Sequence, residues 1–208
     1  MSTALILISI QSTYFKGGSH PLKGTKRSAK AAAKLLWHFR QKKLPVFHVL
    51  YSAPQQEEPA TAARAEAHEL VAPAAEETVI YTASANAFAE EKLIGELQAL
   101  GVKELVIAGF TADHQVNATV RAATEKGFAC TLIQDACVAN SFLFEGNHLK
   151  ADLVLQVFLA SLYHTYAEVC TAKEFLKREE KKERKKYKKS RNSSTETGKK
   201  TKAANLLA

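Results

Sequence analysis

The chain has 208 residues, of which 46% are hydrophobic, a size and composition typical of one globular domain with a sizeable core. No apolar run approaches the roughly 20 residues that a membrane helix needs, so we expect no membrane partner. Of its 29 basic and 21 acidic residues, 12 and 4 lie in residues 178–208, which leaves 17 of each in residues 1–177. The net charge of +8 therefore belongs to the C-terminal end and says nothing about the globular part.

Short apolar runs alternate with helical patterns along residues 1–177. We predict six strands, at residues 4–9, 45–51, 77–82, 103–110, 128–136 and 164–169. The helical patterns cover residues 25–43, 89–101, 116–127, 146–160 and a last stretch from residue 171. Strict alternation of this kind predicts an α/β fold, a three-layer α/β/α sandwich around a central, mainly parallel six-stranded sheet of the Rossmann-like type. Ligands of such sheets bind at the carboxyl ends of the strands.

The composition changes at residue 178, which divides the chain into an α/β domain (1–177) and a Lys-rich basic extension (178–208). The first part of the extension can prolong the last helix. The later Ser/Thr/Gly/Lys mixture of the extension has too few apolar residues to fold alone. The extension is either a solvated end, a nuclear localisation signal, or a contact for RNA, DNA or another polyanion. The candidate polyanion-binding residues are Lys181, Lys182, Arg184, Lys185, Lys186, Lys188, Lys189 and Arg191.

Three cysteines, at 130, 137 and 170, form an odd set without the spacing of a metal site. They favour a reducing compartment over a disulfide framework. With no leader-like stretch at the N-terminus, we expect an intracellular protein, cytoplasmic or, through its basic extension, nuclear. We expect neither a metal nor a cofactor.

Three stretches of the chain follow a known pattern: ALILISIQSTYF, VIYTASANAFAEEKLIGELQALGV and ELVIAGFTADHQVNATVRAATEKGFACTLIQDAC. Their order and spacing resemble the isochorismatase-like superfamily of cysteine hydrolases, which includes nicotinamidases and N-carbamoylsarcosine amidohydrolase. The resemblance extends over roughly residues 4–177. It implies the α/β fold predicted above and a catalytic site at the carboxyl ends of the strands. The family often forms dimers or tetramers, so we also expect a homo-oligomer.

The resemblance implies a Cys nucleophile at a helix amino end, an Asp base on the first strand and an assisting Lys. A thiolate needs these groups, because the Asp removes the proton and the Lys and helix dipole favour the charged form. The matching positions are Ser9 for the Asp, Thr82 for the Lys and Gln115 for the Cys. The resemblance also implies a cis peptide bond between Phe110 and Thr111 that helps to form the oxyanion hole.

These replacements predict that the family mechanism is lost. Relatives that hydrolyse a vinyl ether without the Cys use the first-strand Asp as a general acid, and a Ser9 hydroxyl cannot protonate a substrate near neutral pH. The Asp-x-His metal pair of nicotinamidases has no match in VFHVLYSAP. Three neutral polar side chains also avoid the cost of a buried unpaired charge. Three such replacements are typical of a former catalytic site that has changed to make the protein more stable or to bind a neutral ligand.

Candidate ligand-binding residues surround these positions: Gln11, Tyr14, Phe110, Thr111, His114 and Cys137. Cys137 is either a substitute nucleophile, with His114 as its base, or a small buried hydrophobe, and we favour the latter. Asp113 and His114 are either an acid/base pair or structural residues of the first helical turn, where the dipole favours an Asp, and we favour the structural role. We expect His48 to be a hydrogen-bonded core residue and Trp37 and Phe39 to pack.

The sequence thus predicts a pseudoenzyme: a hydrolase fold kept as a structural or binding component, such as part of a ribonucleoprotein or another large assembly. Two alternatives stay open. One is an active hydrolase of a small amide or related substrate with a rewired site. The other is a small-molecule sensor.

Overall fold

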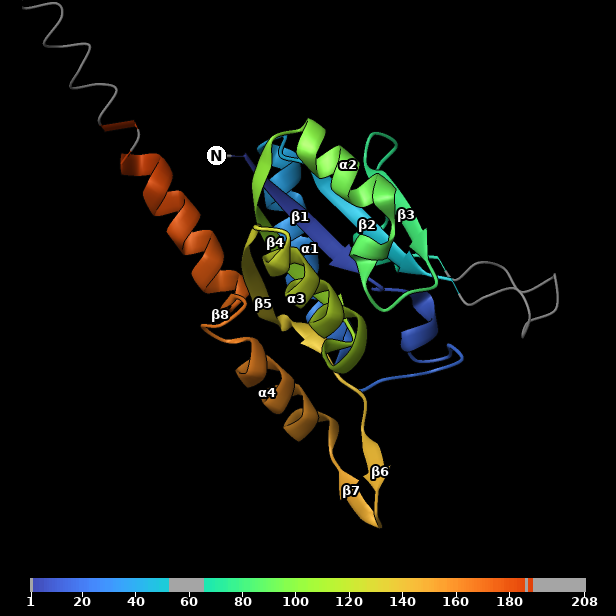
Figure 1. The fold of residues 1–208 in the computed structure, drawn as a ribbon. Coiled ribbons are helices and arrows are strands. Elements are labelled where there is room, and N and C mark those ends of the chain that lie inside the picture. The colour runs from blue at the N-terminus through green and yellow to red at the C-terminus, as the bar shows by residue number, and fades with distance from the viewer. Residues whose placement is uncertain (1, 53–65, 186, 189–208) are drawn as a thin grey trace, which may run out of the picture. The chain divides into compact units, whose positions relative to one another are not determined.

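Six parallel strands form the central sheet, in the order β3-β2-β1-β4-β5-β8 (Figure 1). Every neighbouring pair is parallel, which confirms the predicted six-stranded sheet and makes it entirely rather than mainly parallel. Continuous apolar runs such as ALILI are buried along their whole length because helices cover both faces. The strands are β1 (Ser2–Ile8), β2 (Val46–Tyr51), β3 (Thr78–Thr82), β4 (Val102–Phe110), β5 (Ala129–Val138) and β8 (Glu168–Cys170).

The computed structural model describes residues 2–52, 66–185 and 187–188. The chain divides into two compact units, residues 1–172 and residues 173–208. The first unit contains the whole sheet and the helices that cover it. In the second unit, residues 173–185 are helical, and Lys186, Lys189 and Arg191 of the predicted polyanion set lie outside the described residues. None of the helices in the described ranges is long and apolar enough to cross a membrane.

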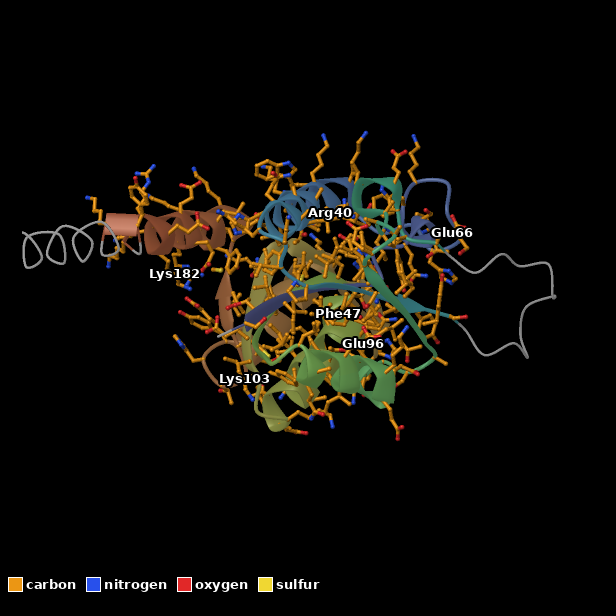
Figure 2. The ribbon with its side chains drawn as sticks, turned by 90° about the horizontal axis from the view of Figure 1, so that it is seen from above. Arg40, Phe47, Glu66, Glu96, Lys103 and Lys182 are labelled. Atoms are coloured by element: carbon orange, nitrogen blue, oxygen red, sulfur yellow. The ribbon has the colours of Figure 1, made fainter. Side chains whose placement is uncertain are left out.

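Helix α1 (Thr25–Gln41) covers one face of the sheet, and α2 (Glu91–Ala99) and α3 (Asn117–Glu125) cover the other (Figures 1 and 2). Leu93, Leu97 and Val120 pack with strand residues such as Phe47, which lies inside the molecule in Figure 2. Three layers result, as predicted. Helix α4 (Ala151–Leu162) contacts α3 and β5.

One helix residue departs from the packing prediction. Phe39 of α1 is buried as expected, but Trp37 is 64% exposed, so the prediction that Trp37 packs is wrong. Trp37 follows Lys34 by three positions, so the two share one side of the helix, and Lys34 is exposed as well.

The segment after β5 differs most from the prediction. A helix was expected from residue 146, whereas α4 begins at Ala151 and the preceding residues form an antiparallel hairpin, β6 (Phe142–Phe144) with β7 (Asn147–Leu149). Glu145 and Gly146 both have positive φ, 49° and 78°, as the two-residue type I′ turn of a hairpin requires. β5 itself runs two residues past its predicted end at residue 136, and this places Cys137 inside the strand.

Gly109 allows β4 to pass close to the end of β1. A Cβ atom at this position would lie 2.1 Å from the carbonyl oxygen of Ile8, which belongs to a neighbouring strand and cannot move away. The close approach holds the end of β4 against the end of β1, where Ser9 follows. A glycine here therefore supports the geometry of the sheet edge.

Replacing Gly109 with alanine should destabilise the fold by about 1–3 kcal/mol in urea unfolding, because the added methyl group collides with backbone. The matched control is Gly95→Ala in α2, where nothing lies within 4 Å of the added Cβ. That change should stabilise the protein by about 0.5–1 kcal/mol through helix propensity. Equal effects of the two substitutions would contradict the close approach of the strands.

Candidate functional site

Ser9, which the resemblance matches to a catalytic Asp, directly follows β1. Its φ is 47°, and its backbone N–H donates to the carbonyl of Val49 at 2.8 Å. The side chain is buried, with 1% of the residue exposed. Its hydroxyl is the buried side-chain polar atom that has no hydrogen-bond partner among the described residues. A buried hydroxyl of this kind is unusual, because most buried polar atoms are hydrogen-bonded.

Thr82, which the resemblance matches to the assisting Lys, is the last residue of β3. The residue is 4% exposed, and its hydroxyl accepts a hydrogen bond from the Ser84 N–H at 3.0 Å. Its carbonyl accepts from Ser52 N–H at 2.9 Å, at the carboxyl end of the neighbouring strand β2. The side chain thus shapes the local turn and brings no charge to the sheet edge.

Gln115, which the resemblance matches to the Cys nucleophile, lies in a π-helical turn (Ala112–Val116) between β4 and α3. Such turns occur often at functional sites. The residue is 4% exposed, and its Oε1 accepts a hydrogen bond from the Thr111 N–H at 3.1 Å. The Tyr14 hydroxyl accepts a hydrogen bond from the same side chain. The Gln115 side chain is therefore engaged with neighbouring groups of the protein.

The peptide bond between Phe110 and Thr111 is cis, at the position that the family resemblance implies. The Thr111 N–H belongs to this bond and would be available to an oxyanion if no side chain approached it. In this chain its partner is the Gln115 amide oxygen. The N–H of the cis peptide bond is thus hydrogen-bonded within the protein.

Asn140, which follows β5, holds the turn in place. Its backbone N–H and its Nδ2 donate to the two carboxylate oxygens of Asp113, at 2.9 and 2.7 Å, and its Nδ2 also lies 3.4 Å from the Thr111 hydroxyl. The Asp113 carboxylate is thus used to connect two loops, in keeping with a structural role. His114 is exposed and is not part of this network in the described residues.

Aromatic rings contact one another close to these polar groups. Tyr14 lies edge-on to Phe110 at 6.2 Å between ring centres, Phe15 lies 6.0 Å from Phe110, and Phe15 stacks on His68 at 3.6 Å. Burial raises the pKa of Tyr14, and the hydrogen bond from Gln115 offsets only part of that effect. The phenol is therefore protonated at neutral pH. His68 belongs to the segment that begins at residue 66. The backbone N–H of His68 donates to the Ile10 carbonyl at 2.8 Å.

Gln11 connects β2 with the segment around Ala67. Its amide makes two bonds to the backbone of Tyr51, Nε2 to the carbonyl at 2.9 Å and Oε1 from the N–H at 2.8 Å. Its own backbone pairs with Ala67 in an antiparallel bridge. Gln11 thus connects the chain that follows β1 to the end of β2.

Cys137 lies on β5 with 2% of the residue exposed, and its Sγ donates to the Ile133 carbonyl at 3.4 Å. Burial raises the pKa of the thiol to about 12, and a hydrogen bond with the Gly109 backbone opposes that shift only weakly. A thiol of this kind carries no thiolate at neutral pH and is a poor nucleophile. The geometry is that of a small buried core residue.

His48 sits in the middle of β2 and contacts a carboxylate rather than the sheet edge. Its Nε2 lies 2.8 Å from Glu77 Oε2, and Arg40 of α1 pairs with the same carboxylate at 2.7 and 2.8 Å. Burial lowers the pKa of His48 more than Glu77 raises it, so a neutral imidazole donates to the carboxylate. This cluster joins α1, β2 and the start of β3, and His48 is a hydrogen-bonded core residue.

Glu77 is the anionic centre of that cluster. Burial alone would raise its pKa, but hydrogen bonds from Arg40, the Ala74 N–H and His48 outweigh it and hold the pKa at about 2. A carboxylate with a lowered pKa stabilises the fold above its unfolded pKa, and this contribution is lost as the pH falls toward 2.

We therefore expect Glu77→Gln to lower the free energy of unfolding by about 2 kcal/mol at neutral pH. The difference from the wild type should shrink as the pH falls from 4.5 toward 2, where the wild-type carboxylate is also neutral. Urea unfolding at several pH values measures it, with the exposed neighbour Glu76→Gln as control. A difference that stays constant over this pH range would show that Glu77 acts without its charge.

Within the described ranges, no three His, Cys, Asp or Glu side chains gather so as to hold a metal ion. The strands bring the Ser9, Thr82 and Gln115 positions to one edge of the sheet, since each lies at or just beyond the carboxyl end of a parallel strand. The sequence interpretation did not identify Asn140 or His68. Asn140 follows β5 at this same edge of the sheet. Its place just after a strand was the one feature of the sequence that could have identified Asn140 as a residue of the site.

The parallel sheet and the helices on both of its faces define the chain as a Rossmann-like α/β protein. A model of the isochorismatase domain matches residues 3–174, and the chain belongs to the isochorismatase family. It is 40% identical over 181 residues to the isochorismatase family protein YddQ of Bacillus subtilis strain 168, covering 85% of this chain and 100% of that protein.

Solved structures of the same class agree with this assignment. An isochorismatase-type hydrolase from Oleispira antarctica is 34% identical with a TM-score of 0.77, covering 84% of this chain and 95% of the other. An isochorismatase from Pseudomonas putida KT2440 is 28% identical with a TM-score of 0.77, covering 83% and 89% of the two chains. This family includes hydrolases, and the fold of this chain is theirs.

Proposed function

We propose that this isochorismatase-family chain has lost hydrolysis and serves as a binding or structural component. The observation that carries the proposal is the hydrogen bond from the Thr111 N–H to Gln115 Oε1. A nucleophile at that position would attack a carbonyl whose developing oxyanion needs free N–H donors. Here the side chain at the nucleophile position is itself an amide, which cannot attack and which takes up a donor.

The other two positions support the same conclusion. Activation of a nucleophile requires a neighbouring base or a positive charge, and Ser9 and Thr82 provide neither. The Thr82 hydroxyl is already engaged as an acceptor for Ser84. Cys137 does not substitute, because its thiol is buried and its pKa lies near 12.

The alternative of a small-molecule sensor has one observation in its favour. The Ser9 hydroxyl is buried and has no partner among the described residues, so a bound neutral molecule or water could complete its hydrogen bonding. The ring of Tyr14 and the polar Thr111 hydroxyl lie on the elements that lead to this edge. A sensor and a structural component share the loss of catalysis and differ in whether the site is occupied.

Restoring the three family residues tests the loss of catalysis. We expect the wild type to hydrolyse no simple amide, and we expect Ser9→Asp/Thr82→Lys/Gln115→Cys to create a thiol with a lowered pKa that iodoacetamide alkylates rapidly at pH 7. The matched control is Gln115→Cys alone, which lacks the base and the Lys and should react slowly. Background alkylation is low because the three native cysteines are buried.

The proposal fails if the wild type hydrolyses an amide and Gln115→Ala abolishes that turnover. Such a result would make Gln115 part of an active, rewired site. Loss of turnover on alkylation of the native cysteines would instead assign the reaction to a cysteine.

The basic extension is the second part of the proposal: it contacts RNA or another polyanion. The described residues 173–185 and 187–188 hold eight Lys and Arg residues and four Glu residues. One of these glutamates, Glu179, pairs with Lys182 at 2.6 Å. An excess of cations of this kind favours a phosphate-rich partner.

We expect Lys181→Glu/Lys182→Glu/Lys185→Glu to elute from immobilised RNA at a clearly lower salt concentration than the wild type, because fewer counterions are released on binding. The control is Lys103→Glu/Lys126→Glu/Lys150→Glu, which makes the same change in net charge on the first unit and should elute close to the wild type. Equal losses in the two variants would show that net charge alone, and not the extension, retains the protein.

Self-association is a further part of the proposal. The hairpin and α4 expose apolar side chains to an extent unusual for a surface, including Leu143 at 75%, Phe144 at 64%, Leu153 at 52% and Val157 at 57%. A two-stranded hairpin is marginally stable by itself in water, and exposed apolar patches commonly mark contacts with another chain. A second copy of this chain, or a neighbouring subunit of an assembly, would bury these groups.

A further inference from the structure

The charges of the globular part are divided along the chain. Residues 1–56 hold nine Lys and Arg residues and no Asp or Glu, whereas residues 57–177 hold eight basic and 17 acidic residues. The domain is neutral as a whole only because these two parts cancel. Eight of the nine cations lie between residues 23 and 43, on α1 or next to its ends.

Helix α1 has one apolar and one basic side. Ala29, Ala32, Leu35, Leu36 and Phe39 are buried against the sheet. Lys26, Lys30, Lys34 and Trp37 follow one another at spacings of four, four and three residues, so they form a continuous row on the exposed side, which we call the Lys–Trp face. The row measures about 16 Å along the helix axis. Long side chains with nitrogen tips stand out from this helix in Figure 2.

Trp37 contributes nothing to the core from this position. It is 64% exposed, whereas tryptophan is highly buried on average. The buried side of the helix is already filled by leucines and Phe39. An indole exposed to water at the end of a row of lysines is therefore available to a partner.

The lysines of this face carry charges that no carboxylate neutralises in the described residues. The carboxylate close to α1 is Glu77 at its C-terminal end, and Arg40 and His48 occupy it. Glu69 lies in the short turn that contacts the same end of the helix. The sequence of α1 itself contains no acidic residue, so Lys26, Lys30 and Lys34 lack the i,i+4 partners common on exposed helices.

We propose that the Lys–Trp face binds single-stranded RNA. A row of cations attracts a phosphate chain, and an exposed aromatic ring provides a surface on which an unpaired base stacks, the combination used by proteins that bind single strands. A length of about 16 Å accommodates roughly five stacked nucleotides at about 3.4 Å each. This inference goes beyond the proposed function and depends neither on the hydrolase site nor on the basic extension.

The composition of the face favours a single strand over other polyanions. A membrane-surface helix lays an apolar side of several large residues into the lipid, and here that side is buried against the sheet. A duplex keeps its bases stacked inside, so it could use the lysines but not the indole. Only an unpaired strand uses both parts of the face.

Trp37 is the sole tryptophan of the chain, so the intrinsic fluorescence of the full-length protein reports on this face directly. Titration with a 20-nucleotide oligouridylate, whose bases are free to stack, should quench it in a saturable way that weakens as salt is added. Lys26→Glu/Lys30→Glu/Lys34→Glu should abolish the quench. Trp37→Ala, followed by the anisotropy of a labelled oligonucleotide, should weaken binding about tenfold or more at this face.

Two controls separate this face from the rest of the protein. Lys103→Glu/Lys126→Glu/Lys150→Glu changes the net charge equally and should leave the quench intact. Lys181→Glu/Lys182→Glu/Lys185→Glu should also leave it intact, even though it weakens retention on RNA. If the extension alone binds RNA, anisotropy rises without any quench, and the proposal for α1 falls while that for the extension stands.

Other outcomes would also overturn the proposal. These are equal quenching by duplex RNA of the same length, stronger quenching by phosphatidylserine vesicles, and loss of the quench in the Lys103/Lys126/Lys150 variant. Circular dichroism of each variant confirms that α1 remains folded.

Discussion

The hydrogen bond between the Thr111 N–H and Gln115 Oε1 is the interaction on which the rest of the site depends. It joins the cis peptide bond at the end of β4 to the Gln115 side chain, which also hydrogen-bonds with Tyr14. Asn140 fixes the same turn from the neighbouring strand through Asp113. The polar groups of this turn are thus hydrogen-bonded within the protein.

Neutral residues at these positions also make physical sense as a set. A lone Asp at position 9 would be a buried charge with no cation nearby, because Thr82 and Gln115 carry none. An ion pair of the described residues lies elsewhere, where Arg40 and a neutral His48 both bond to Glu77 and stabilise the junction of α1, β2 and β3. Positive charge is concentrated instead on the exposed side of α1 and on the C-terminal extension. Both of these suit a phosphate-rich partner.

Much of the fold could be predicted because strands buried on both faces are continuous apolar runs, and these are easy to recognise in a sequence. The positions of Ser9, Thr82 and Gln115 followed from motif spacing. The hairpin after β5 was missed because FLF and NHL are too short to show a period, and the turn at Glu145–Gly146 depends on backbone angles. Trp37 was misjudged since its neighbours Leu36 and Phe39 are apolar, and only the helix's orientation shows which residues face solvent.

Amide hydrogen exchange at Thr111 tests the central claim most directly. If Gln115 Oε1 is the partner of this N–H, exchange in the wild type should be slow, and Gln115→Ala should accelerate it at least tenfold. The Ile107 amide, in the middle of β4, should keep its rate and so serve as an internal reference. Unchanged exchange at Thr111 in the Gln115→Ala variant would contradict the claim that this side chain occupies the donor.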